Sequence, residues 1–439
     1  MYLNTHTYYS LRYGTLKPEE LLQLASQQGV KSMALTDINS TSANLDFVRL
    51  APKYSIKPVL GVDFRNGVQQ KFIVLASCNK SLQLINNYLS EFLHSENKII
   101  PDTAKHFSNS YVIYPFKNKV FDLKAHEFIG VKPSDLNQLK FSKWQLQLDK
   151  LVILKTVSFQ NKKAFNTHRL LRAIDNNTLL SKLPKTEQGE ETDTMLPVET
   201  LKSLYSEYPQ IIDNTQKLLD SCNITFDFSN TAPKNKKTYS NNAALDFKLL
   251  KKLAYEGLNY RYKRIGERIF SRLEKELEII KQKQFVSYFL INWKILKYAR
   301  SKQYYYVGRG SGANSIVAYL LRITDVDPIE LDLYFERFIN LYRTNPPDFD
   351  LDFSWRDRDD IMNFIFNSFK NTSLIAVYNT FKYRASVREI GKVFGLPKEE
   401  IDKLSSGYFE VKNLDNLSRL VLVYSKMIKG FPNYLGIHP

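Results

Sequence analysis

Three aspartates alternate with apolar residues in one short stretch of the chain, residues 347–353. Successive side chains of a β-strand point to opposite faces, so this pattern predicts that Asp348, Asp350 and Asp352 share one face. Neighbouring carboxylates are costly to desolvate without a cation. Carboxylates two residues apart lie about 6.6 Å apart along a strand, which lets them converge on two divalent ions about 3.5–4 Å apart. The spacing therefore indicates a two-metal site for displacement at phosphorus.

Two other interpretations fit the same stretch. A calcium-binding loop also begins Asp-x-Asp-x-Asp, but it needs glycine at its sixth position and glutamate at its twelfth. Phe353 and Asp359 occupy those positions here, which disfavours a calcium loop. The stretch taken by itself is also compatible with an edge strand whose acidic side chains are simply solvated.

A glycine-rich turn precedes the acidic stretch. Residues 304–307 predict an apolar strand, residues 308–313 form the turn, and residues 314–321 predict a helix. This arrangement favours phosphate binding, because backbone N–H groups and the positive end of a helix face the anion. Arg309 would add a bidentate phosphate donor. The turn is not a P-loop, since no Gly-Lys-Ser/Thr closes it. A phosphate cradle beside a two-metal strand favours nucleotidyl transfer.

Composition limits the class of protein. The chain has 439 residues, is 43% hydrophobic and carries a net charge of +17, which predicts several domains and a polyanionic partner such as nucleic acid. The alternative explanation of the charge is a compositional bias toward Lys, Asn, Ile, Tyr and Phe, as AT-rich coding sequence would give. Cys78 and Cys222 are the only cysteines, so we expect a reducing, cytoplasmic location without disulfides. The sequence has no long apolar run and no signal-peptide pattern at its start, so we expect no membrane contact.

The first part of the chain alternates predicted strands and helices. Strands are expected at residues 1–5, 31–36 and 57–64, with helices at 18–28 and up to about 52 between them. Such alternation implies parallel strands with helical crossovers, an α/β arrangement whose functional residues collect at the C-terminal ends of the strands. Those ends carry four polar residues, Asn4, His6, Asp37 and Asp63.

The segments around these residues resemble the PHP (polymerase and histidinol phosphatase) family of metal-dependent phosphoesterase barrels. The family usually has His-x-His in its first motif, Asp-His in its second and Glu in its third. Here Asn4 replaces the first histidine, Ile38 follows Asp37, and Asp63 replaces the glutamate, while His6 is retained. Two further motif positions also differ, at Lys71 and Thr156. Isoleucine cannot replace an imidazole ligand, so we expect a vestigial site without metals.

A second resemblance covers the glycine-rich turn and the acidic stretch. Residues 307–313, 323–328, 335–338 and 347–353 are similar, in order and spacing, to the palm of bacterial DNA polymerase III alpha subunits, which are family C replicative polymerases. That family also begins with a PHP barrel. The resemblance implies an α/β multi-domain chain in which a PHP-type (β/α) barrel precedes a polymerase beta-like nucleotidyltransferase palm. The turn departs from the family pattern, because it is two residues shorter before Arg309.

The resemblance also implies roles for the site residues. Asp348 and Asp350 match catalytic aspartates that bind two Mg²⁺ ions. Asp352 matches an acid that is common in the family but is not one of its three catalytic carboxylates. It lies about 13 Å from Asp348 along a strand, too far to share the same ions easily. The loop that holds the incoming triphosphate corresponds to Gly310 and Ser311, with Arg309 in support.

The end of the chain resembles the start of the family's helical thumb, which grips duplex DNA. Four basic residues there are candidate phosphate contacts, although a solvated helix face explains them equally well: Lys382, Arg384, Arg388 and Lys392. We expect a PHP-like barrel with a helical extension at 1–229, a linker at 230–243, the palm at 244–376 and a partial thumb at 377–439. The family continues through a third carboxylate and the fingers, so we expect a truncated chain with an incomplete active site.

The expected function is DNA-directed DNA polymerisation, with the 439 residues inactive by themselves. The implied partners are primer-template DNA, deoxynucleoside triphosphates, the sliding clamp, the clamp loader and other replisome subunits. Two alternatives remain. A PHP-type phosphoesterase or 3′–5′ exonuclease is disfavoured by the altered ligands at Asn4, Ile38 and Thr156. A non-catalytic DNA-binding scaffold is the other.

Overall fold

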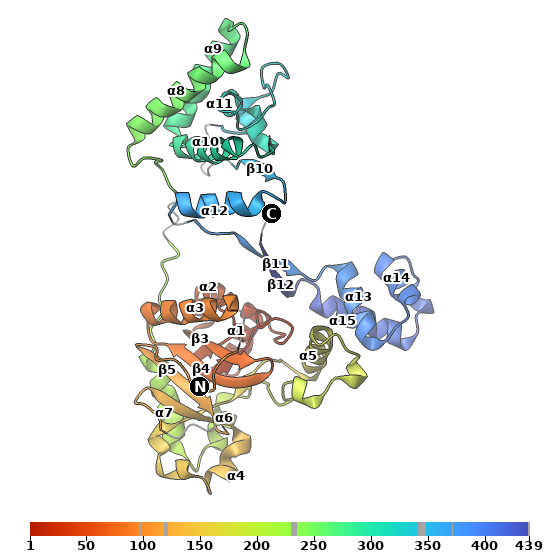
Figure 1. Cartoon of the computed structure of the whole chain (residues 1–439). Helices are drawn as coiled ribbons and strands as arrows, with labels where there is room; N and C mark the ends of the chain where they lie inside the picture. The colour runs from red at the N-terminus through yellow and green to blue at the C-terminus, as the bar shows by residue number, and fades with distance from the viewer. Residues whose placement is uncertain are drawn as a thin grey trace. The chain divides into compact units, whose positions relative to one another are not determined.

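The computed structural model describes residues 1–95, 99–117, 122–229, 235–340, 342, 348–370 and 372–437. The chain divides into two compact units (Figure 1). The first unit comprises Met1–Ser229 and Ile375–Pro439, and the second comprises Asn230–Leu374. The segment that was expected to begin a separate thumb therefore groups with the barrel-like part of the chain.

A curled sheet forms the centre of the first unit (Figure 1). Its hydrogen-bonded order is β2-β3-β4-β5-β6-β7, and a second pair, β1 and β8, runs in parallel. An isolated parallel bridge between Tyr2 and Met33 continues the ladder from β1 toward β2. The strands are β1 (Asn4–Thr5), β2 (Ser32–Leu35), β3 (Lys57–Asn66), β4 (Gln69–Ala76), β5 (Ser110–Pro115), β6 (Glu127–Val131), β7 (Leu151–Ile153) and β8 (Thr156–Val157).

The strand directions agree with the expectation made for residues 1–5, 31–36 and 57–64. Strands β2 and β3 are parallel, as the strand–helix alternation predicted. Strand β4, whose direction was not predicted, is antiparallel to both of its neighbours. The cause is local, since the chain reverses between Asn66 and Gln69 through Gly67, whose φ of 59° suits a residue without a side chain. No helical crossover is needed where a tight turn joins the strands.

Helices flank this sheet and bury its apolar side chains. Strand residues such as Val62, Phe64 and Val74 are fully buried, and α3 adds Leu82 and Ile85 to the same core. The helices of this part are α1 (Pro18–Gln27), α2 (Asn44–Leu50), α3 (Asn79–His94), α4 (Leu136–Leu139), α5 (Lys162–Asp175), α6 (Val198–Leu204) and α7 (Pro209–Ser221). The mixed α/β class expected from the sequence is confirmed.

The C-terminal part of the first unit packs on helix α5. It contains the ribbon β11 (Ala376–Thr380) and β12 (Pro432–Ile437), with α13 (Tyr383–Phe394), α14 (Lys398–Ser406) and α15 (Asn416–Ile428). Val387 and Ile390 of α13 share one core with Leu170 and Leu171 of α5. The ring centroids of Tyr9 and Tyr378 also lie 5.1 Å apart, which ties the ribbon to the loop after β1.

His168 of α5 is buried in its neutral form. Its Nδ1 atom lies 2.8 Å from the carbonyl oxygen of Tyr13, and the N–H of Gly189 donates to Nε2 at 2.8 Å. Burial lowers the pKa of His168 to about 3. Because a histidine in the unfolded chain has a pKa of about 6.5, protonation favours unfolding, and the stabilisation present above pH 6.5 is lost as the pH falls toward 3.

We predict that His168 makes the first unit sensitive to mild acid. The free energy of unfolding should be lower by about 2 kcal/mol at pH 5, as follows from the difference between the folded and unfolded pKa values of His168. A His168→Gln variant keeps one donor and one acceptor but does not titrate, so its free energy of unfolding should fall less between pH 7 and pH 5. Urea unfolding at both pH values measures this, and an equal fall in both proteins would contradict the prediction.

The second unit packs helices against a two-stranded sheet. Its elements are α8 (Ala243–Arg261), α9 (Glu267–Gln282), α10 (Val286–Ser301), β9 (Tyr306–Arg309), α11 (Ile316–Leu320), β10 (Asp350–Phe353) and α12 (Arg358–Ser368). Leu250, Leu277 and Phe289 from the three long helices lie in one core.

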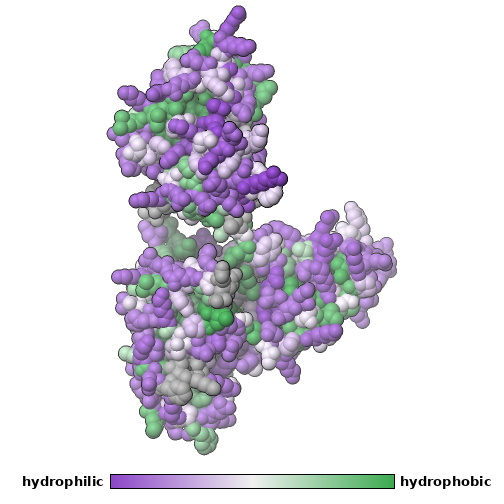
Figure 2. All heavy atoms as spheres, viewed as in Figure 1, coloured by the Kyte–Doolittle hydropathy of each residue, from purple (hydrophilic) through white to green (hydrophobic). Residues whose placement is uncertain are grey.

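Among the described residues, no helix has both the length and the apolar character needed for a membrane crossing. The face drawn in Figure 2 is mostly hydrophilic.

Candidate functional site

The acidic stretch lies on the outer face of the sheet formed by β9 and β10. Exposure alternates along residues 348–353, with the three aspartates exposed and the apolar residues between them partly buried. Phe349, Leu351 and Phe353 pack on the core of the second unit, and the Phe349 ring centroid lies 5.0 Å from that of Phe338. The predicted acidic and apolar faces are therefore present. The regular strand is shorter than expected, since it begins at Asp350, and Pro347 lies outside the described residues.

Arg309 supplies positive charge to this acidic face. It is directly opposite Asp350 in the antiparallel ladder. Its Nε donates to Oδ2 of Asp352 at 2.6 Å, and its Nη1 lies 3.6 Å from Oδ2 of Asp350. Asp352, and to a lesser degree Asp350, raises the pKa of Arg309. The three side chains are 59, 55 and 48% exposed for Arg309, Asp352 and Asp350, so water and salt screen the ion pairs.

Gly310 brings the glycine-rich turn into contact with Asp350. Its φ is +74°, and a Cβ atom at this position would lie 2.4 Å from Oδ2 of Asp350. The positive φ favours glycine, and a larger side chain here would have to displace the Asp350 carboxylate. Ser311 follows within a 3₁₀ helix, Gly310–Asn314, where its carbonyl oxygen accepts a hydrogen bond from Nδ2 of Asn314 at 2.9 Å. The sequence-predicted nucleotide loop thus lies beside the sequence-predicted metal ligand.

The helix after the turn does not offer its N-terminus to a phosphate, which corrects the sequence interpretation. Helix α11 begins at Ile316 rather than at residue 314. The N–H groups of Ile316 and Val317 donate to the carboxylate of Glu276 at 3.2 and 3.4 Å, and the Ser315 hydroxyl donates to it at 2.8 Å. Glu276 is buried, burial raises its pKa, and Arg272 lies 2.7 Å from it. A phosphate near the turn would have to be bound by the residues before α11.

Glu276 was missed in the sequence interpretation. The only signal is its place in α9, where it is buried alongside Leu273, Leu277 and Ile280. A buried carboxylate needs nearby donors or a cation, and the helix N-terminus of α11 supplies the donors.

The four barrel residues are buried in the first unit. Asn4, His6, Asp37 and Asp63 are each at most 1% exposed. His6, directly after β1, links β3 and the residue after β8, because its Nε2 lies 3.0 Å from Oδ2 of Asp63 and its Nδ1 lies 2.8 Å from Oγ of Ser158. Asn4 is held in another way: Thr36 Oγ1 donates to its Oδ1 at 2.9 Å, and its Nδ2 donates to Thr156 Oγ1 at 3.1 Å.

Arg65 completes this network, although the sequence interpretation did not select it. Its Nε and Nη2 donate to Oδ2 of Asp63 at 2.9 and 2.6 Å. Burial opposes ionisation of Asp63, but Arg65 and His6 hold the pKa of this carboxyl group well below its usual range. The other oxygen, Oδ1, is buried without a hydrogen-bond partner among the described residues. The signal in the sequence was the spacing, because residues two apart in a strand share a face.

Asp37 is bound by three donors from the loop after β1. The N–H of Thr7 donates to Oδ1 at 2.6 Å, its hydroxyl donates to Oδ2 at 2.7 Å, and the Ser10 hydroxyl donates to Oδ1 at 2.7 Å. Burial raises the pKa of Asp37 in spite of these hydrogen bonds. Protein donors therefore occupy both oxygens of Asp37 and one oxygen of Asp63, and the Arg65 guanidinium beside Asp63 would repel a metal cation. These residues do not fit a metal ion.

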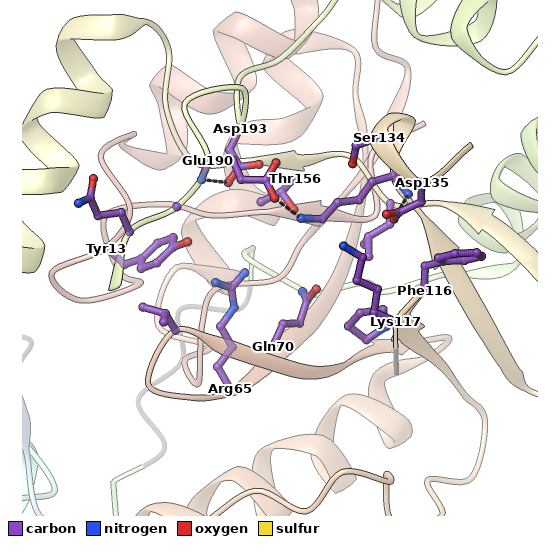
Figure 3. Close-up of a pocket in the computed structure, with 16 residues that line it drawn as sticks. Tyr13, Arg65, Gln70, Phe116, Lys117, Ser134, Asp135, Thr156, Glu190 and Asp193 are labelled. Carbon is purple, nitrogen blue, oxygen red and sulfur yellow. Dashed lines mark hydrogen bonds and ion pairs between the residues drawn. The ribbon is translucent and has the colours of Figure 1, made fainter. Parts of the chain in front are cut away.

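A cavity of about 290 Å³ opens beside this network (Figure 3). Arg65 and Gln70 line it, and the Arg65 guanidinium lies 5.1 Å from the centroid of the Tyr13 ring. Charges of both signs are already paired along its wall, since Lys132 Nζ lies 2.8 Å from Oε1 of Glu190. The lining thus shows no concentration of one charge that would select an ion.

No group of three or more His, Cys, Asp or Glu side chains is arranged to hold a metal within the part of the chain that the structure describes. The acidic face of β10 nevertheless suits Mg²⁺ chemically. Magnesium prefers oxygen ligands and is usually bound through one or two carboxylates together with substrate phosphates. Asp348 and Asp350 provide two exposed carboxylates of this kind.

The candidate DNA contacts lie on one exposed face of α13. Arg384, Arg388 and Lys392 are spaced by four residues and are exposed, while Val387 and Ile390 face the core. Lys382 is exposed at the N-cap of the helix. Two of the four basic groups have acidic partners, since Arg388 lies 3.0 Å from Asp402 and Lys392 lies 2.8 Å from Glu389.

Two family models together match most of the chain. A PHP domain model matches residues 3–228, and a model described as the bacterial DNA polymerase III alpha NTPase domain matches residues 248–439.

Curated relatives match across both regions. The DNA polymerase III subunit alpha of Bacillus subtilis (strain 168) is 28% identical over 100% of this chain and 44% of its own length. That of Streptococcus pyogenes serotype M3 is 29% identical over 97% of this chain and 40% of its own length. The error-prone DNA polymerase of Symbiobacterium thermophilum is 26% identical over 92% of this chain and 42% of its own length. The chain thus spans less than half the length of these relatives.

Proposed function

The chain belongs to the bacterial DNA polymerase III alpha family, and we propose from this premise that it serves in template-directed transfer of deoxynucleotides to a primer 3′-hydroxyl. The observation that carries the proposal is the contact between Gly310 and Asp350, which joins the glycine-rich turn to the acidic face. The substrates are primer-template DNA and deoxynucleoside triphosphates. The sliding clamp, clamp loader and other replisome subunits are its partners, and the cytoplasm is its location.

Asp348 and Asp350 are the proposed ligands of two Mg²⁺ ions. When bound, the ions would help to deprotonate the primer hydroxyl and offset the charge that develops at phosphorus. The chain's own contribution is positioning. The β9–β10 ladder fixes the backbone of Asp350 opposite Arg309, and the apolar side chains of β10 anchor the strand on the core. Gly310 and Ser311 would bind the triphosphate through backbone N–H groups, and Arg309 would donate to its oxygens.

Binding of a fluorescent deoxynucleoside triphosphate, followed by anisotropy with Mn²⁺ present, tests this proposal on the 439 residues. We expect binding that requires the metal and is lost in Asp350→Asn. The exposed Asp359 of α12 provides the matched control, and Asp359→Asn should bind like the wild type. Metal-independent binding, or equal binding by Asp350→Asn, would contradict the proposal. We do not expect the 439 residues to extend a primer, because the family site implies a further carboxylate beyond these two aspartates.

The barrel residues are proposed to be structural rather than catalytic. We expect the wild type to have no phosphatase or 3′–5′ exonuclease activity, because Arg65 and the loop donors already bind the carboxylates. His6→Ala and Asp37→Ala should therefore have no such activity to lose. Both variants should melt at a lower temperature, since each leaves buried polar groups unpaired. Release of nucleotides from 3′-labelled DNA, assayed with Mn²⁺ or Zn²⁺, provides the measurement. Metal-dependent release that His6→Ala abolishes would favour the phosphoesterase alternative instead.

A further inference from the structure

Asp352 forms a hydrogen bond with Arg309, yet the proposed metal site does not use this acid. Along a strand it lies about 13 Å from Asp348, too far to share the same ions readily. Its Oδ2 accepts from Arg309 Nε at 2.6 Å. The third aspartate of the alternating stretch therefore has a partner within the protein.

The position of Arg309 makes this contact important for Asp350. Arg309 is opposite Asp350 in the ladder, and its Nη1 lies 3.6 Å from Oδ2 of that residue, beyond ordinary hydrogen-bond length. A guanidinium that close is a competitor for the carboxylate that would bind a divalent ion. Of the two acids, Asp352 has the shorter contact with Arg309, at 2.6 Å against 3.6 Å for Asp350.

We propose that Asp352 is a positioning residue that holds Arg309 away from Asp350. In this role it leaves Asp350 available to a divalent ion and keeps the Arg309 guanidinium beside the glycine-rich turn. The inference rests on the proposed function, because it assumes that Asp350 binds a metal. It assigns a role to the one acid of the stretch that the two-metal site leaves unexplained.

Removing the Asp352 charge should weaken metal binding through Arg309. In Asp352→Asn, Arg309 is free to pair with Asp350, and Mn²⁺ binding should weaken about three- to tenfold, the range expected for one screened charge a few ångströms away. Arg309→Gln alone should bind Mn²⁺ at least as tightly as the wild type. The double variant Asp352→Asn/Arg309→Gln should recover wild-type binding, because the competitor is gone.

The measurement is titration of the 439 residues with Mn²⁺, with free Mn²⁺ followed by its electron paramagnetic resonance signal. Asp359→Asn is the control for loss of an exposed acid nearby. Wild-type binding by Asp352→Asn would overturn the inference. So would a double variant as weak as Asp352→Asn, because Asp352 would then be a metal ligand itself. Equal Mn²⁺ binding by wild type and Asp350→Asn is a different outcome, which removes the proposed function and the positioning role with it.

Discussion

Replacing Asp348 or Asp350 with asparagine is expected to lower nucleotide incorporation by at least about three orders of magnitude, in a polymerase that carries these residues. Each substitution keeps the size of the side chain but removes a negative charge that would hold a metal ion. Both residues are exposed, so the fold should survive the change. Primer extension with Mg²⁺ and four deoxynucleotides, under single-turnover conditions, measures the rate of the chemical step.

The control separates loss of metal from loss of fold or of DNA binding. Asp359→Asn removes an exposed acid from α12 and should extend primers normally. Duplex binding by Asp348→Asn and Asp350→Asn should remain close to that of the wild type. Near-normal extension by either variant would show that the reaction does not depend on the acidic face of β10.

The second large effect concerns DNA binding. The affinity of the 439 residues for duplex DNA should fall roughly 60- to 1,000-fold between 50 and 200 mM salt, for a log–log slope of about −3 to −5 with some four to six phosphates neutralised. The net charge of +17 and the basic face of α13 motivate this expectation. Binding should show little sequence preference, because contacts to phosphates carry no base information. Anisotropy titrations of labelled duplexes at several salt concentrations give the slope.

Arg384 and Lys392 provide a matched comparison within the basic face. Both are exposed on α13, but Lys392 lies 2.8 Å from Glu389, whereas no ion pair of Arg384 occurs among the described residues. Arg384→Gln should therefore weaken binding more than Lys392→Gln and should reduce the salt slope by about 1. Salt-independent binding, or unchanged binding by Arg384→Gln, would favour a solvated helix face over a DNA contact.

Local patterns predicted much of the second unit and of its site. The family was predicted from motif order and is confirmed by the two matching models. The alternation at residues 348–353 predicted which side chains pack on the core, because the two faces of a strand depend only on neighbouring residues. The metal and nucleotide roles of the site residues stay predictions.

Pairings between distant segments could not be read from the sequence. The contact of Arg309 with Asp352 depends on the register of β9 against β10. That register places Arg309 opposite Asp350, and Asp352 is the next acid on the same face. The carboxylate of Glu276 reaches the start of α11 only because α9 packs there, which is why a phosphate was wrongly expected at that helix end. In the first unit, the antiparallel direction of β4 follows from the turn at Gly67, which the strand–helix pattern of residues 1–64 does not cover.

The central claim is that Asp348 and Asp350 hold divalent ions beside the glycine-rich turn. It is tested most directly by counting Mn²⁺ ions bound to the 439 residues in the presence of a non-hydrolysable deoxynucleoside triphosphate, by electron paramagnetic resonance. We predict Mn²⁺ binding that the nucleotide strengthens, that is absent in the double variant Asp348→Asn/Asp350→Asn and that is unchanged in Asp359→Asn. Equal Mn²⁺ binding by the wild type and the double variant, with nucleotide present, would contradict the claim.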